Sequence, residues 1–406
     1  IYWNNSGDTP IQSDNPSGVN WEVNFSIVEG GWNYAGQGNL NTNPQFVNTN
    51  QDDFQLQAGS PAINVSDEAS FPYTDLIGNP RILNGKSDMG AYEFRGDICG
   101  NGQRLYVDID ASGFENGTSW ENAYTDLQDA LTAARTCENV QEIWIAEGMY
   151  LPTDDLNVDI SFELVEGVSM YGGFNGTETS LSQRDWTLHP TLLSGSFGDR
   201  TNIISEETRT RLILKGENLY APMVIDGLVI EGAYGKGMEL TNTTNSIKSA
   251  PVIINCTFDN NDNWYGDAGG LSLINVAPVI DNCTFTRNFS DNDGGDIFVL
   301  GSDSLRITNS SFSGNATESG GGIASYVPYL EVENCVFHYC DAEIAGGGAI
   351  YTSLGSDLTV RNCTFTENDV DEGDGSVFHL GGTTLIKNTN IRRNGNAKRR
   401  YIPYED

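Results

Sequence analysis

A short motif recurs through the C-terminal half of this chain at a nearly constant interval. The tetrapeptide NCTF stands there three times, and the near-copies NSSF, NCVF and NTNI fill the remaining places. The six asparagines that open these motifs are Asn255, Asn282, Asn309, Asn334, Asn362 and Asn388. They lie 27, 27, 25, 28 and 26 residues apart. A period of roughly 20 to 50 residues is typical of solenoids and propellers, so the chain is expected to stack similar units.

Two other sets of residues keep the same period. One set follows the glycine-rich stretches, and it comprises Leu271, Ile297, Ile323, Ile350 and Val377. The other set stands three residues after each repeat aromatic or its substitute, and it comprises Asn261, Asn288, Asn315, Cys340, Asn368 and Asn394. Because three registers share one period over several copies, the repeat extends to the whole unit.

Each repeat has the local pattern of short strands joined by sharp bends. In LTVRNCTF, Leu358 and Val360 lie on one face of a strand, since side chains alternate. Asn362 then breaks the run, and asparagine tolerates the left-handed conformation of a tight bend. Cys363 and Phe365 resume on the next strand. With about three strands and three bends per copy, the sequence predicts an all-β fold, a parallel β-helix solenoid, because a propeller blade needs about 40 residues.

Stacking of the coils predicts two ladders of like residues. Neighbouring strands lie about 4.8 Å apart, so the six motif asparagines are expected to hydrogen-bond to one another and to the backbone at the bend. The aromatic residues are expected to fill the core as a second ladder. These are Phe258, Phe285, Phe312, Phe337 and Phe365. This arrangement resembles the side-chain ladders of cross-β structures, within one chain.

A capping element is predicted before the coils. Residues 119–137 carry an apolar helical stripe, made of Ala123, Leu127, Leu131 and Ala134. Thr118 or Ser119 is a suitable N-cap. The end of a solenoid exposes strand edges and core, so a short amphipathic helix near 119–137 is expected to cover that end.

Composition excludes some functions. The 406 residues include 21 Lys plus Arg and 56 Asp plus Glu, for a formal net charge of −35. Nucleic acids and anionic membranes bind clustered basic residues, so no nucleic-acid partner is expected. No apolar run approaches membrane-spanning length, so no membrane insertion is expected. The seven cysteines include no close pair of the kind that binds metal, and the four in the repeat are expected to be small buried residues.

Two groups of motifs resemble a known family. The strings YGGFNGTETSLSQRDW and NGTSWENAYTDLQDAL, followed by the GG-x-I and N-C-x-F repeats, resemble right-handed parallel β-helix (pectate-lyase-like) secreted proteins of the Bacteroidetes. The strings SPAIN and DMGAYEF resemble the terminal region of the same family. The resemblance implies that 1–94 closes one β-helix module, that 95–104 is a linker, and that 105–406 opens a second module of a longer or truncated chain.

The same resemblance implies a function outside the cell. It implies export to the bacterial cell surface and a non-catalytic structural or adhesive role, as an adhesin or a surface-filament subunit. The expected partners are other copies of the chain, neighbouring modules of the same chain, or cell-surface glycans.

The alternative is a carbohydrate-active enzyme. A lyase would need converging basic groups, whereas the basic residues of the coils are sparse; a glycoside hydrolase would need paired carboxylates, which the acidic loops offer.

Calcium is the one cofactor that the sequence suggests. Ca²⁺ prefers several oxygen ligands in flexible loops, and it would relieve repulsion between acidic coils. The candidate ligands are Asp108, Asp110, Asp291, Asp293, Asp369 and Asp371. The first two begin a run similar to an EF-hand loop, but the twelfth position is Ser119 rather than Glu. A turn that leads into the capping helix is the alternative reading of that run.

Overall fold

The chain forms two compact units. The computed structural model describes residues 22–32, 35–57, 60–63, 65–66, 74–78, 81, 87–94, 103–137, 139–153, 157–197, 208–243, 251–313, 316–370, 375, 377–379 and 381–392. The first unit comprises 1–100 and 111–123, and the second comprises 101–110 and 124–406. Most of the predicted linker 95–104 lies outside the described residues, and the predicted module boundaries stay a prediction.

The first unit contains one antiparallel strand pair and a small core. Strands β1 (Phe46–Asn48) and β2 (Asp53–Leu56) pair around the 3-10 turn η1 (Thr49–Gln51). Single parallel bridges join 22 to 35 and 27 to 40. The buried core comprises Ile27, Leu56, Ala62 and Met89.

A buried charged network holds the GAYEF motif of the first unit. The Arg81 guanidinium lies 2.8 Å from a carboxylate oxygen of Glu93. Glu93 also accepts a hydrogen bond from the backbone N–H of Asp88 at 2.9 Å. Its own N–H donates to Asp75 at 3.1 Å. Burial raises the pKa of Glu93 to about 7. The motif residues are therefore constrained by one another as well as by the core.

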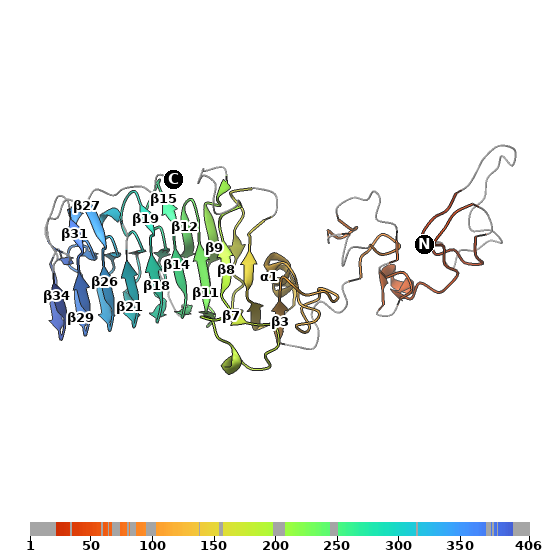
Figure 1. Cartoon of the computed structure of the whole chain (residues 1–406), viewed down its shortest axis with the longest axis horizontal. Helices are drawn as coiled ribbons and strands as arrows, with labels where there is room; N and C mark the ends of the chain where they lie inside the picture. The colour runs from red at the N-terminus through yellow and green to blue at the C-terminus, as the bar shows by residue number, and fades with distance from the viewer. Residues whose placement is uncertain are drawn as a thin grey trace. The chain divides into compact units, whose positions relative to one another are not determined.

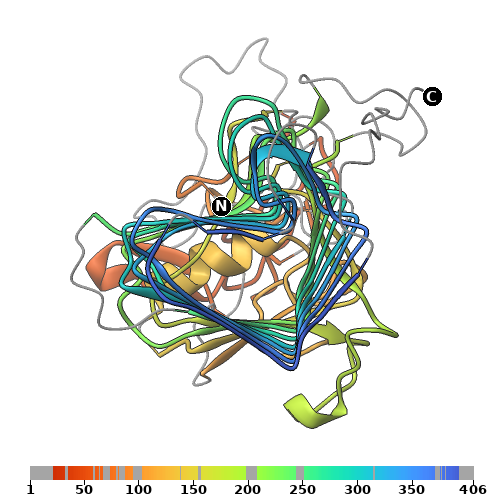
Figure 2. The same cartoon turned by 90° about the vertical axis from the view of Figure 1, so that its left-hand side faces the viewer.

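The second unit is a parallel β-solenoid (Figure 1). Seen along its axis, successive coils overlay in a three-sided outline with an added loop (Figure 2). Among the described residues, the three sides are sheets of ten, nine and eight strands. The ten-stranded sheet contains β3 (Arg104–Val107), β4 (Glu142–Ala146), β7 (Ser169–Phe174), β10 (Val224–Asp226), β13 (Val252–Ile254), β17 (Val279–Asp281), β21 (Ser304–Thr308), β25 (Tyr329–Glu333), β29 (Asp357–Arg361) and β33 (Thr384–Lys387).

The other two sides follow the same order along the chain. The nine-stranded sheet contains β5 (Gly148–Tyr150), β8 (Thr191–Ser194), β11 (Leu228–Glu231), β14 (Thr257–Asp259), β18 (Thr284–Thr286), β22 (Ser311–Ser313), β26 (Val336–His338), β30 (Thr364–Thr366) and β34 (Asn390–Arg392). The eight-stranded sheet contains β6 (Phe162–Glu163), β9 (Leu212–Glu217), β12 (Lys236–Thr241), β16 (Leu271–Ile274), β20 (Ile297–Leu300), β24 (Ile323–Tyr326), β28 (Ile350–Thr352) and β32 (Val377–His379).

The acidic loops form a fourth sheet that the sequence did not predict. Five short parallel strands pair along the loop edge of the coils. They are β15 (Asp262–Asn263), β19 (Phe289–Ser290), β23 (Ala316–Ser319), β27 (Asp341–Gly346) and β31 (Asp369–Val370). The regular coils therefore have four strands rather than three, because backbone pairing between coils continues through the acidic loops.

The repeat asparagines form the corner between the ten- and nine-stranded sheets. All six have φ between 51° and 55°, in the left-handed region. The Asn282 amide donates to the Asn255 amide oxygen at 2.7 Å, and Asn334 donates to Asn309 at 3.2 Å. In the preceding coil Gly227 takes the corner with φ 73°, which glycine adopts without strain.

The repeat phenylalanines form a continuous stack inside the solenoid. Consecutive ring centroids lie 4.5 to 5.0 Å apart, with interplanar angles of 0° to 3°. Each of the five rings is at most 1% exposed. Strand register produces this stack, since each Phe is paired with the Phe of the next coil.

The predicted helix covers the first coil, but it is shorter than expected. Helix α1 spans Leu127–Thr136 and packs against β3 and β6, the end strands of two sheets (Figures 1 and 2). Its N-cap is Asp126, which accepts from the N–H of Gln128 at 2.8 Å. Ser119 and Thr118 are not the cap, because Tyr124 pairs with β3: its N–H donates to Tyr106 at 2.9 Å.

The solenoid confirms the predicted fold class, a mostly-β parallel solenoid with one short helix. Among the described residues, no helix has the length and apolar character needed to cross a membrane.

Candidate functional site

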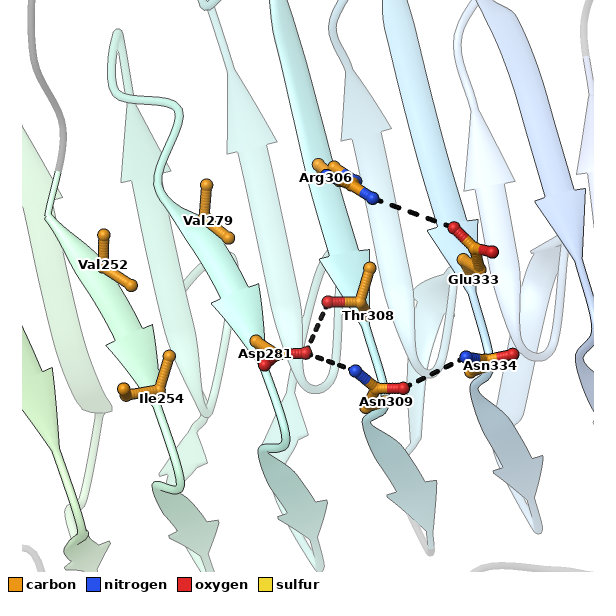
Figure 3. Close-up of a pocket in the computed structure, with 9 residues that line it drawn as sticks. All are labelled: Val252, Ile254, Val279, Asp281, Arg306, Thr308, Asn309, Glu333 and Asn334. Atoms are coloured by element: carbon orange, nitrogen blue, oxygen red, sulfur yellow. Dashed lines mark hydrogen bonds and ion pairs between the residues drawn. The ribbon is translucent and has the colours of Figure 1, made fainter. Parts of the chain in front are cut away.

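A shallow groove runs along the outer face of the ten-stranded sheet (Figure 3). It has a volume of about 460 Å³ and spans β13, β17, β21 and β25. Its lining residues are Val252, Ile254, Val279, Asp281, Arg306, Thr308, Asn309, Glu333 and Asn334. The groove follows from strand register, because Val252, Val279 and Arg306 occupy one outward column.

Polar ladders end in carboxylates along this groove. Four corner amides form two short runs: Asn282 donates to Asn255, and Asn334 donates to Asn309. The last amide of each run donates to a carboxylate of the preceding coil. Asp281 is one such carboxylate, and accepts from Asn309 at 2.6 Å and from the Thr308 hydroxyl at 2.5 Å (Figure 3). Asp226 does the same for Asn255 at 2.6 Å. These carboxylates therefore have a structural role in the ladder.

The basic groups beside the groove are engaged in ion pairs. Arg306 lies 3.4 Å from Glu331 and 3.8 Å from Glu333. Arg361, two coils further, lies 3.1 Å from Glu331. A lyase needs a basic group that can abstract a proton, and here both guanidinium groups share carboxylate partners. The groove thus offers an aliphatic floor with a charge-balanced rim.

The acidic edge joins two acidic residues of consecutive coils through a backbone hydrogen bond. The N–H of Asp293 donates to the Asp267 carboxylate at 3.3 Å. The Tyr326 hydroxyl donates to Asp293 at 2.5 Å. Burial raises the pKa of Tyr326, and this hydrogen bond raises it further. Tyr326 therefore remains a hydrogen-bond donor to a carboxylate.

The predicted calcium ligands do not form one cluster. Asp291 is exposed and Asp293 partly buried after β19, whereas Asp369 is buried on β31. Strands β23 and β27 separate those two strands in the sheet. Asp371 lies outside the described residues.

Asp108 and Asp110 form a turn at the end of β3. Asp108 accepts a hydrogen bond from the N–H of Asp110 at 3.0 Å. Burial raises the pKa of the Asp108 carboxyl. Within the described ranges, no three His, Cys, Asp or Glu side chains gather as a metal site would require. Calcium binding stays a prediction.

Two buried arginines were missed by the sequence analysis. Arg184 pairs with Asp226 and donates to the Gly172 carbonyl at 2.9 Å. Arg209 lies 2.8 Å from Asp262 and donates to three carbonyls, those of Gly232, Ala233 and Asn260. Neither residue belongs to the repeat, so no periodic signal identifies them.

The carboxyl of Asp296 was also missed. It is fully buried and accepts from the Asn288 amide at 2.8 Å. Burial raises the pKa of Asp296 well above its usual range. Asn288 itself belongs to a buried amide ladder, because it accepts from Asn261 at 3.0 Å. The repeat register of Asn261 and Asn288 is visible in the sequence, but it does not identify the buried acid beside them.

The comparison with known families agrees with the geometry of the regular coils. Residues 241–399 match the family described as right handed beta helix region. Neither the curated proteins nor the solved structures gave a match to this chain. The match covers the coils with the asparagine corners and the phenylalanine stack, and it assigns this part of the chain to a right-handed parallel β-helix.

Proposed function

We propose that this chain is a non-catalytic, extracellular structural and adhesive module of a large cell-surface repeat protein. In this role it is part of an adhesin or a surface filament that attaches to cells or glycans. The observation that carries the proposal is the constant register of the three main sheets in the regular coils, in which the phenylalanines stack from coil to coil. Such a stack produces a stiff rod, and a stiff rod suits presentation of binding surfaces away from a cell.

Three further features support this proposal. The outer groove has an aliphatic floor and paired charges, which suits adhesion rather than proton transfer. Cys137 is disulfide-bonded, and disulfides persist in oxidising compartments such as the cell exterior. A net charge of −35 favours a well-solvated surface. Copies of the chain side by side would bind a surface with high avidity.

A carbohydrate-active enzyme is the second candidate. The pair Asp267 and Asp293 favours it, because glycoside hydrolases use two carboxylates on either side of a bond. The Tyr326 hydroxyl on Asp293 would then orient one of the two. The acidic edge of the fourth sheet would be the active site.

The two candidates differ in what happens to a polysaccharide. The purified chain is incubated with neutral and acidic polysaccharides, with and without added calcium, and the polymer length is measured by size-exclusion chromatography. The proposal expects unchanged length in every sample. If the wild-type chain shortens a polymer and the Asp293→Asn variant does not, the adhesive proposal is overturned in favour of a glycoside hydrolase. A calcium-dependent rise in thermal stability would support the predicted calcium sites.

A further inference from the structure

A partly exposed aromatic cluster lies at and beside β15 and β19, the first strands of the fourth sheet; Figure 1 labels these two strands. We name it the aromatic platform, and it comprises Tyr234, Trp264, Tyr265 and Phe289. We propose that the aromatic platform binds a neutral saccharide, an inference that rests on the proposed adhesive function and assigns its binding site.

The platform spans three consecutive coils. The Trp264 ring lies 4.4 Å from the Phe289 ring of the next coil. The Tyr265 ring lies 6.3 Å from the Tyr234 ring of the preceding coil. Backbone hydrogen bonds fix this order: the Asp262 N–H donates to Ala233, and the Phe289 N–H donates to Asn261. Two ring pairs, Tyr234–Tyr265 and Trp264–Phe289, thus each bridge neighbouring coils of the solenoid.

Core packing does not account for Tyr265. Its side chain is 76% exposed, whereas the five stacked phenylalanines are at most 1% exposed. Contiguous apolar patches mark binding sites more often than single exposed residues do, and the exposed Tyr265 ring lies against the half-buried Tyr234 ring. Tyr265 is therefore the residue of the platform most available to a ligand.

Hydrogen bonds from a buried asparagine stabilise the turn that carries Tyr265. Asn263 is 7% exposed, and its amide donates to the carbonyls of Asp267 at 2.9 Å and Ala268 at 3.1 Å. These bonds hold the turn between β15 and the glycine-rich stretch in one shape. A preorganised ring loses little conformational entropy on binding, so the Asn263 hydrogen bonds favour a ligand site at this turn.

Carboxylates at the rim select the kind of ligand. Asp291 is exposed, and its N–H donates to the Asn263 carbonyl at 2.9 Å, which places it next to the turn that carries Tyr265. Asp267 ends the same turn. Carboxylates accept hydrogen bonds from hydroxyl groups and repel anions, while aromatic faces pack against the apolar face of a sugar ring. Together they suit a neutral saccharide and disfavour uronates.

Affinity electrophoresis tests this inference. The purified chain migrates through gels that contain xylan, galactomannan, β-glucan or polygalacturonate. At least one neutral polymer is expected to retard the chain, with polygalacturonate ineffective. Tyr265→Ala should weaken the retardation about tenfold through loss of the exposed ring. The matched control Tyr329→Ala removes another exposed ring, 37% exposed on β25, and should bind as the wild type does.

Three results would overturn the inference. They are the absence of retardation by any neutral polymer, equal retardation of Tyr265→Ala and wild type, or a Tyr265→Ala effect on self-association alone. Sedimentation of both variants distinguishes the last case and checks folding. Failure here leaves the proposed adhesive function in place, whereas that function itself fails only if polymers are shortened.

Discussion

The early coils (103–110 and 124–243) and the regular coils (251–370) share one solenoid but differ in what holds their strands together. At the inward position of the nine-stranded sheet, the early coils have Leu193 and Ile230, whereas the regular coils have the phenylalanine stack. At the corner, Gly227 takes the place of the asparagines. The same backbone path is therefore compatible with two sets of side chains.

The early coils depend on buried ion pairs instead of ladders. The Arg184 side chain is 7% exposed and its partner Asp226 is 5% exposed. The Arg184 guanidinium also lies 5.1 Å from the Trp186 ring. Arg209 hydrogen-bonds to carbonyls at the transition to the regular coils. The loops of the early coils vary in length. There, a long basic side chain makes the contacts between coils that repeated side chains make in the regular coils.

Loss of a ring from the centre of the stack should have the largest effect. Phe312→Ala removes contacts with Phe285 and Phe337 and leaves a cavity in a closed core, so a loss of about 3–5 kcal/mol in unfolding free energy is expected. Chemical denaturation measures it. Val336→Ala, at an outward position that is 44% exposed, is the control and should cost less than about 1 kcal/mol. Equal losses of unfolding free energy in both variants would show that a stacked phenylalanine contributes no more to stability than an exposed valine does.

In the early coils, the corresponding large loss of stability is expected when a buried arginine is removed. Arg184→Ala leaves Asp226 buried without its ionic partner, and about 3 kcal/mol of stability should be lost. Arg211→Ala removes an exposed pair with Asp159 and should cost less than about 1 kcal/mol. Denaturation midpoints of the two variants provide the comparison. If Arg184→Ala were as stable as Arg211→Ala, the early coils would need another explanation.

A corner substitution should have a smaller effect. Asn309→Ala replaces asparagine, which tolerates φ 52°, by a residue that does not, and removes the bonds to Asp281 and Asn334, for an expected cost of about 1–2 kcal/mol. Asn309→Gly relieves the backbone strain, as Gly227 does in the early coils, and should cost less. Thermal unfolding of both variants separates the two contributions. A glycine variant less stable than the alanine variant would contradict the role of backbone conformation.

The buried acid of the regular coils should produce the smallest, pH-dependent effect. Burial raises the pKa of Asp296 above its usual value, so its contribution to stability is complete below about pH 4. That contribution is lost as the pH rises through the folded-state pKa, because the folded protein then holds a buried charge. Asp296→Asn resembles the protonated acid and should lose less stability with rising pH. Unfolding curves of the wild type and of Asp296→Asn over a pH series test this. The same pH dependence in both would show that Asp296 is not the source of the effect.

Periodicity made the solenoid predictable from sequence, and irregular contacts limited the rest. The asparagine and phenylalanine registers predicted a fold because each coil repeats one set of neighbours. The fourth sheet was not predicted, since its strands pair through backbone groups and carry polar residues such as Asp262 and Asp369. The N-cap Asp126 was missed because Tyr124 pairs with β3, a contact between residues far apart in the pattern.

The candidate sites were less predictable than the fold. Asp369 is in register with Asp341 and Phe289 on the fourth sheet, whereas Asp291 lies two residues beyond Phe289, and the sequence alone did not reveal that strand pairing. Arg184 meets Asp226 across 42 residues, and neither lies in a repeated motif. The sequence does not distinguish Tyr265 from rings such as Phe298; only the structure does, because Tyr265 is 76% exposed and Phe298 is 6% exposed.

Hydrogen exchange of Phe312→Ala tests most directly the claim that columns of like side chains hold the regular coils. Stability in a solenoid is passed between neighbouring repeats, so exchange should rise in β18, β22 and β26, while β4, β7 and β9 of the early coils keep the protection of the wild type. A uniform rise over all these strands, or no rise in β18 and β26, would contradict the account.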